Sequence, residues 1–316
     1  MDALVGIEQD QIEITTDTTI DNIRFIKNGF MIGDGATLTL NTPLRVSGAL
    51  QFGDHNGGAL NLNGDLQLAT DAYFSNGGTI RGNGHTINLN GDQEIPGVLH
   101  FTSDTIVEGN GNTITFDGGS LMVEDAVSVT LRNMIIKLPS SDELACASAL
   151  SSLSLDNVTL CLEDQYTFDS GRLFIDNTVV MRKADSMFRS SNGDFVLSSD
   201  SAITILPNSC WFFETGCNFC YNPSVANRDL LRFADVSSQL FLNGCSLYST
   251  PTGMRLSKGS VVVDGKNYIY AEGESLSEAV AFGNNESGEE LAIHILPGAS
   301  IAVESGCLDY SNLAVG

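Results

Sequence analysis

One short phrase recurs along the chain and restricts the fold more than any other feature of the sequence. Residues 60–65 read LNLNGD, and the phrase returns 27 residues later as INLNGD at 87–92 and again as ITFDGG at 114–119. The residues before the last two copies also agree, because RGNGHT precedes Ile87 and EGNGNT precedes Ile114. An internal repeat of about 20–50 residues is typical of a solenoid, in which each unit stacks on the next.

The same pattern continues after the phrase itself has changed. Segments of the form apolar–x–apolar, followed by two small polar residues, begin at Val129, Leu153, Leu173, Leu240 and Val261. Strand alternation places the flanking apolar residues on one face, and an Asn or Gly after them can adopt the left-handed backbone of a sharp corner. We therefore predict an all-β chain that forms one β-solenoid domain over residues 1–316, with roughly thirteen coils.

The phrase also resembles a known group of folds. Gly82–Ile87 and Gly109–Ile114 are similar to the recurrent rung phrase of the right-handed parallel β-helix, or pectin-lyase-like, superfamily, and the variable coil length is similar too. The resemblance implies a right-handed parallel β-helix. That superfamily includes lyases, glycoside hydrolases, phage tailspikes, adhesins and structural fibres, so the resemblance implies no particular chemistry.

Two stretches interrupt the repeat. Residues 208–229 are rich in aromatic and cysteine side chains, and residues 271–291 are rich in glutamate. We predict irregular loops at both places, which is where solenoids carry most of their function. The aromatic residues of the first stretch could stack on sugar rings.

The charge of the chain restricts its partners. Asp and Glu number 39 against 15 Lys and Arg, which gives a formal net charge of −24. Such a field repels nucleic acid and anionic membranes. No apolar run approaches the roughly 18 residues of a membrane span. We expect neither a nucleic-acid partner nor membrane insertion.

Three aspartates are the best metal candidates, namely Asp65, Asp92 and Asp117. If the copies of the phrase occupy equivalent points of successive coils, these carboxylates stack about 5 Å apart and could hold calcium. The alternative is that each is a turn residue that hydrogen-bonds the backbone. No Arg or Lys recurs beside them to act as the base of a lyase, and we expect no other cofactor.

Other groups of candidate residues do not match a known type of active site. Polygalacturonase-like hydrolases need close carboxylates, an adjacent Asp-Asp pair and a Gly-His-Gly, and the sequence contains neither of these two motifs. His85 comes nearest, but its counterpart in the next copy is Asn112, so we predict no catalytic role for it. Cys217 and Cys220 have the spacing of half a zinc site without a second pair, which favours buried thiols or a local disulfide. We predict that the chain is not an enzyme.

An asparagine recurs at a predicted corner of successive coils. Stacked amides can hydrogen-bond along the axis of a solenoid and stabilise it. The predicted structural ladder consists of Asn83, Asn110, Asn133, Asn157 and Asn177.

These patterns predict an extracellular or cell-surface structural protein, a subunit of a fibre that assembles head to tail with itself. Neither end shows an evident cap, so the predicted assembly residues are Leu4, Val5, Ile7, Leu313 and Val315. The alternatives are a carbohydrate-active or glycan-binding β-helix, such as a polysaccharide lyase or tailspike, and an adhesin that contacts a cell surface.

Overall fold

All of the regular secondary structure in the part that the structure describes is β-strand. A computed structural model describes residues 6–7, 10–53, 57–138, 142–184, 193–199, 201–272, 275, 278–283 and 291–309. Contacts divide the chain into unit 1, residues 1–137 and 142–153, and unit 2, residues 138–141 and 154–316. No helix in the described part is long and apolar enough to cross a lipid bilayer.

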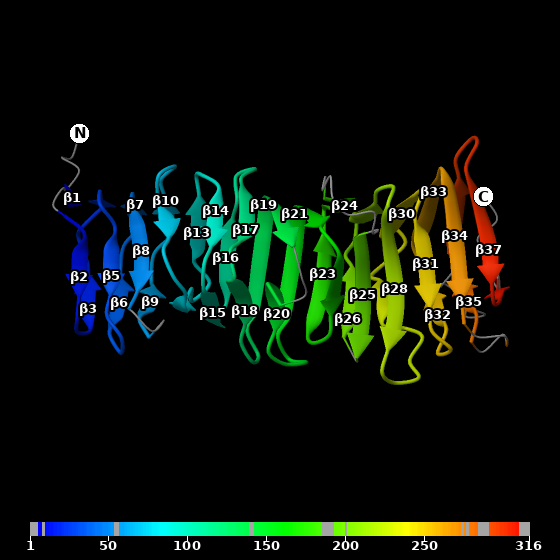
Figure 1. Cartoon of the computed structure of the whole chain (residues 1–316), viewed down its shortest axis with the longest axis horizontal. Helices are drawn as coiled ribbons and strands as arrows, with labels where there is room; N and C mark the ends of the chain where they lie inside the picture. The colour runs from blue at the N-terminus through cyan, green and yellow to red at the C-terminus, as the bar shows by residue number, and fades with distance from the viewer. Residues whose placement is uncertain are drawn as a thin grey trace. The chain divides into compact units, whose positions relative to one another are not determined.

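Each unit is a stack of coils, and each coil contributes short strands to three faces (Figure 1). In unit 1, face 1 consists of β1 (Gly6–Ile7), β4 (Phe25–Ile26), β7 (Leu44–Val46), β10 (Leu66–Leu68), β13 (Thr86–Leu89), β16 (Thr105–Glu108) and the first half of β19 (Ser128–Leu138). Face 2 consists of β2 (Ile12–Ile14), β5 (Phe30–Ile32), β8 (Ala49–Phe52), β11 (Tyr73–Phe74), β14 (Gln93–Ile95), β17 (Thr113–Phe116) and the second half of β19. Face 3 consists of β3 (Thr18–Ile20), β6 (Thr37–Leu40), β9 (Ala59–Leu62), β12 (Gly78–Arg81), β15 (Val98–Ser103), β18 (Ser120–Val123) and β20 (Leu144–Cys146).

Unit 2 has the same three faces. Face 1 consists of β23 (Arg172–Asp176), β26 (Ala202–Ile205), β29 (Leu231–Phe233), β32 (Met254–Leu256), β35 (Val280–Phe282) and β38 (Leu308–Asp309). Face 2 consists of the second half of β21 (Ser152–Leu162), β24 (Thr178–Lys183), β27 (Cys210–Phe213), β30 (Gln239–Asn243), β33 (Ser260–Asp264) and β36 (Ala292–Ile295). Face 3 consists of β22 (Gln165–Phe168), β25 (Gly193–Ser199), β28 (Cys217–Pro223), β31 (Ser246–Ser249), β34 (Lys266–Ala271) and β37 (Ser300–Ser305).

Every one of these pairings is parallel, which confirms the predicted parallel β-solenoid. Alternation along the strands turns one set of apolar side chains inward, where residues of successive coils lie directly above one another. One such column in unit 1 is Leu44, Leu66, Ile87, Val107 and Leu131. A column in unit 2 is Leu160, Met181, Phe213 and Leu242. All of these side chains are buried, so the core is a set of aliphatic and aromatic stacks.

The 27-residue repeat is not the length of a coil in this part of the chain. Ile87 pairs with Leu66 on one side and Val107 on the other, whereas Ile114 pairs with Gln93. Residues in register therefore lie about 21 positions apart, as the Thr86–Asp65 contact shows. Each copy of the phrase lies one face further around its coil, from β9 on face 3 to β13 on face 1 and β17 on face 2. The three strands of a coil share one pattern, so similar phrases occur on different faces.

The predicted loop at 208–229 is wrong for half of its length. It contains β27 and β28, two regular strands of faces 2 and 3. Their aromatic side chains Trp211, Phe213 and Phe219 are buried, because this part of the interior is filled by rings rather than by aliphatic residues. They are therefore not available for stacking on a sugar. In the second predicted loop, 271–291, β35 forms a strand, and residues 273–274, 276–277 and 284–290 lie outside the described residues.

Candidate functional site

The three predicted metal ligands do not come together. Asp65 lies between faces 3 and 1, Asp92 between faces 1 and 2, and Asp117 between faces 2 and 3. The predicted stack of carboxylates is therefore wrong, because it assumed that the 27-residue repeat equals one coil. Among the described residues, no group of three or more His, Cys, Asp or Glu is placed to hold a metal ion.

Two of these aspartates instead connect adjacent coils. The Oδ1 atom of Asp65 accepts a hydrogen bond of 2.9 Å from the backbone N–H of Thr86, and Oδ1 of Asp92 accepts one of 2.8 Å from Thr113. Asp17 and Asp104 accept equivalent bonds from the first residue of a strand in the next coil. An aspartate at a corner thus satisfies a backbone donor that the ladder would leave free. Their role in these contacts is structural.

His85 has one acidic neighbour. Its Nδ1 lies 3.6 Å from Oδ1 of Asp65, and both side chains are more than a third exposed. Glycoside hydrolysis needs a second carboxyl group across the scissile bond, and the same Asp65 oxygen already accepts the N–H of Thr86. The pair offers a surface contact between corners of adjacent coils.

The predicted asparagines all occupy the left-handed backbone region, with φ between 50° and 55°. Asn83 lies at the corner between faces 3 and 1, whereas Asn110, Asn133, Asn157 and Asn177 lie between faces 1 and 2. The five do not all share one corner. Asn208 has φ of 57° between β26 and β27, a corner of the same kind that the sequence analysis missed.

The amides of four of these asparagines bond to the preceding coil, with a different partner at each position. Nδ2 of Asn83 donates to Oδ1 of Asn61 at 2.8 Å, and Nδ2 of Asn177 donates to Oδ1 of Asp156 at 2.6 Å. The partners of Asn110 and Asn133 are the carbonyl of Leu89 and the carboxylate of Glu108.

A continuous side-chain ladder occurs elsewhere in unit 1. Asn63 donates to Asn41 at 2.8 Å, and Asn41 donates to Asp21 at 2.7 Å. Each lies just after a strand of face 3. The sequence signal was an Asn directly after the last apolar residue of its strand.

One ion pair with a buried carboxylate, between Glu108 and Arg132, was also missed. Glu108 is largely buried in β16 and accepts hydrogen bonds from Nε of Arg132 at 2.7 Å, from Asn133 and from the N–H of Asn110. Burial alone would raise the pKa of Glu108, but these donors outweigh it, and the pKa lies below its ordinary value. Glu108 is a coil-to-coil anchor rather than a general acid.

The cysteines of unit 2 are buried or half-buried thiols that form no disulfide. Burial raises the pKa of Cys210 to about 11 and that of Cys217, Cys220 and Cys245 to about 12. A nucleophilic or metal-binding cysteine needs thiolate at neutral pH. These four cysteines are therefore protonated, and they are structural residues of the core or of the sheets around it.

We expect these four thiols to resist Ellman's reagent in the native protein at pH 8. A group with a pKa of 11 or 12 carries on the order of one thiolate per thousand molecules or fewer at that pH. Unfolding in urea should expose all seven cysteines at ordinary rates. Rapid native labelling of Cys217 or Cys245, located by peptide mass spectrometry, would contradict this assignment.

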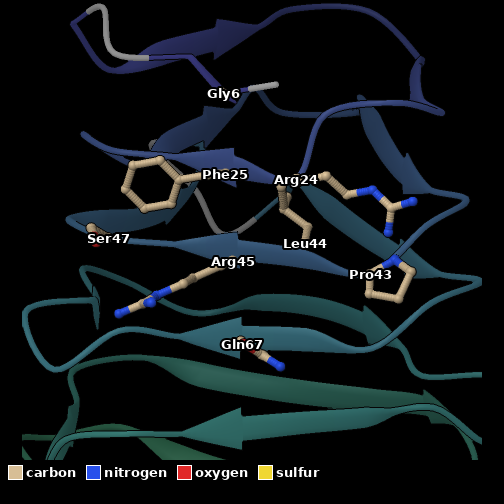
Figure 2. A pocket seen from close by; sticks show the side chains of 8 residues that line it. All are labelled: Gly6, Arg24, Phe25, Pro43, Leu44, Arg45, Ser47 and Gln67. Carbon is tan, nitrogen blue, oxygen red and sulfur yellow. The ribbon is translucent and has the colours of Figure 1, made fainter. Parts of the chain in front are cut away.

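The described residues line two surface hollows that are large enough to admit a ligand. The first, of about 730 Å³, lies on face 1 of unit 1, and its lining includes Arg24, Phe25, Arg45 and Gln67 (Figure 2). Figure 2 shows the side chains of Phe25, Arg45 and Gln67 on successive strands, and Phe25 pairs directly with Arg45. The two arginines make this a locally positive place on an acidic chain, which can attract an anion.

The second hollow, of about 430 Å³, lies on face 3 of unit 2. We call it the tyrosine hollow. Its lining consists of Gln165, Asp194, Val196, Cys220, Tyr221, Asn222, Tyr248, Ser249, Thr250, Tyr270, Glu272 and Ser305. The rings of Tyr248 and Tyr270 stack there, with centroids 4.8 Å apart and planes 9° apart. This pair could not be predicted from the sequence, because two tyrosines 22 residues apart, one on each strand, become neighbours only once the register is known.

Comparison with models of known protein families, with curated proteins and with solved structures found no significant match.

Proposed function

We propose that this chain is a non-enzymatic structural protein of the cell surface, a right-handed β-solenoid subunit that associates end to end with copies of itself. The observation that carries the proposal lies in unit 2: among the described residues, no further coil stacks on the one formed by β36 and β37, and apolar side chains of that coil are exposed. We call it the uncovered coil. The coil beneath it is fully packed. The support for association comes from the uncovered coil. The predicted assembly residues Leu4, Val5, Leu313 and Val315 lie outside the described residues, and the side chain of Ile7 is not described.

The uncovered coil continues inward columns that are buried one coil earlier. Ile295 stacks on Val263 and is 56% exposed, whereas Val263 is fully buried. Val303 stacks on Ile269 and is 42% exposed, whereas Ile269 is 1% exposed. Apolar side chains placed in a core column but left in water favour burial by a further coil.

The backbone of the same coil offers hydrogen bonds as well. Within the described residues, β36 pairs with β33 only and β37 with β34 only. An unpaired strand edge is a template for another strand, and a head-to-tail contact between identical chains propagates into a filament unless it closes into a ring. A coil of a second copy supplies both the apolar columns and the backbone partners that this edge can accept.

The non-enzymatic role and the surface location are part of the same proposal. The aspartates, His85 and thiols described above serve the packing of the coils. A fibre subunit is one of the functions of the superfamily that the rung phrase resembles, and a net charge of −24 suits a hydrated outer surface.

The double variant Ile295→Lys/Val303→Lys is expected to reduce assembly. Two ammonium groups in the apolar contact would have to lose their hydration without gaining a partner. Sedimentation velocity at increasing protein concentration, with electron microscopy of the same samples, measures the effect. The unaltered chain should shift to larger species, and the double variant should stay monomeric.

Val236→Lys is the matched control, because Val236 is also an exposed valine of unit 2 but lies between β29 and β30, away from the uncovered coil. It should assemble like the unaltered chain. A strictly monomeric unaltered chain at the highest concentrations, with or without calcium, would refute the assembly proposal.

A further inference from the structure

We propose that the tyrosine hollow of unit 2 binds a neutral polysaccharide chain that lies across the stacked strands of face 3. The hollow is lined by residues from six successive strands, β22 through β37. Five strand spacings of about 4.8 Å give a length of roughly 24 Å, which suits an extended polymer rather than a compact metabolite. Its volume of about 430 Å³ lies within the range of about 300–1,000 Å³ found for ligand sites.

The middle of the hollow is an apolar strip built by the register of the sheet. Val196 pairs with Cys220, Cys220 with Tyr248, and Tyr248 with Tyr270, so these outward side chains form one column. Tyr248 is 37% exposed and Tyr270 is half-buried. The protonated thiol of Cys220 is a small apolar neighbour that leaves room beside the larger ring. The apolar C–H face of a sugar ring can lie against such a strip.

Polar side chains border the strip on both sides. On one side are Gln165 and Asp194, which pair with each other; on the other side are Asn222 and Glu272. Oδ1 of Asp194 accepts a hydrogen bond from Asn218 at 2.7 Å, and its Oδ2 has no hydrogen bond within the described residues. An apolar strip between donors and acceptors is complementary to a sugar, which has C–H groups on its ring face and hydroxyl groups around its edge.

The tyrosine rings supply contact area at low entropic cost. The stack of Tyr248 on Tyr270 holds both rings in place, and Tyr268 contacts Tyr270 with centroids 6.4 Å apart. Neither Tyr248 nor Tyr270 forms a hydroxyl hydrogen bond to another described residue. Ordered rings whose hydroxyl groups bond to no other described residue can therefore bind a hydroxylated ligand without first breaking a contact to those residues.

The charge of the hollow selects the class of polysaccharide. Two carboxylates, Asp194 and Glu272, line it, and the described residues of its lining include no Lys or Arg. A polyuronate or a sulfated polymer would bring like charges next to these groups, which costs affinity. A neutral polymer meets no such repulsion.

Affinity electrophoresis of the full chain tests the proposal. Gels would contain a soluble neutral β-glucan, a neutral α-glucan, a galactomannan or, as the anionic probe, polygalacturonate. At least one neutral polymer should retard the protein, and polygalacturonate should not. Tyr248→Ala and Tyr270→Ala should each weaken binding roughly tenfold, whereas Tyr248→Phe, which keeps the ring, should stay within about twofold of the unaltered chain.

Tyr73→Ala is the matched control, because Tyr73 is an exposed tyrosine of unit 1 outside the hollow. It should bind normally. If Tyr248→Ala lowers the melting temperature, Asn222→Ala, at an exposed polar position of the hollow, provides the independent test and should also weaken binding. The inference does not depend on assembly, so Ile295→Lys/Val303→Lys should still bind.

Three results would overturn the inference. One is the absence of retardation by every neutral polymer. Another is equal, tyrosine-dependent retardation by polygalacturonate. The third is a loss of affinity in Tyr73→Ala as large as that in Tyr248→Ala.

Discussion

Leu160→Asp is expected to unfold the coils of unit 2 around β21. Leu160 is 1% exposed and lies in an inward column that continues through Met181, Phe213 and Leu242. Removing this leucine from the core loses about 1.5–3 kcal/mol of burial energy. An unpaired carboxylate in its place adds a desolvation cost of several kcal/mol, whether the group stays charged or takes up a proton.

The sum of the lost burial energy and the desolvation cost is comparable to the total stability of a typical domain, about 5–15 kcal/mol. In a solenoid each coil contacts only its neighbours, so the loss spreads along the stack from the altered coil. Urea unfolding followed by circular dichroism measures this loss of stability. Thr159→Asp is the control, because Thr159 is the adjacent, half-exposed residue of the same strand. Equal stability of the two variants would mean that Leu160 is not a core residue.

The strand pattern made the fold predictable. Apolar alternation in segments such as residues 240–244 and 261–265 is a local property, and it survives as the inward columns of β30 and β33. Corners were predictable for the same reason, since an Asn or Gly with positive φ is a local requirement of the backbone.

Register was not predictable from the repeat. The phrases at 60–65, 87–92 and 114–119 agree because every strand and corner of a coil obeys the same rules, not because they occupy one place in successive coils. Aligning phrases therefore gave a stack of Asp65, Asp92 and Asp117 that the register excludes. Contacts across coils depend on the exact number of residues per turn of the solenoid, and this number varies.

The candidate binding site could not be predicted either, because it also depends on the register between coils. Aromatic density in the sequence pointed to 208–229, where the rings are in the core, because burial depends on which face of a strand a residue occupies. Tyr248 and Tyr270 are isolated in the sequence and come together only through the pairing of β31 with β34. A site made from one residue per coil leaves almost no local signal.

Trp211→Ala should cost about 3–5 kcal/mol, the range for removing a buried large aromatic side chain. Trp211 is fully buried on β27, between Val179 and Leu240 in its column. Its ring centroid lies 4.7 Å from that of Phe213 and 5.2 Å from that of Phe219, so truncation removes several ring contacts and leaves a cavity among rigid neighbours.

Trp211→Phe should cost much less, because two opposing effects nearly cancel. The smaller ring loses packing, but the indole Nε1 of Trp211 is buried with no hydrogen-bond partner among the described residues, and an unsatisfied donor costs about 1–3 kcal/mol. Chemical denaturation monitored by circular dichroism would compare the two variants, since the chain has a single tryptophan and both variants lose its fluorescence. If Trp211→Phe is as destabilising as Trp211→Ala, the indole nitrogen forms a hydrogen bond in the folded protein. Packing alone then does not account for the contribution of Trp211 to stability.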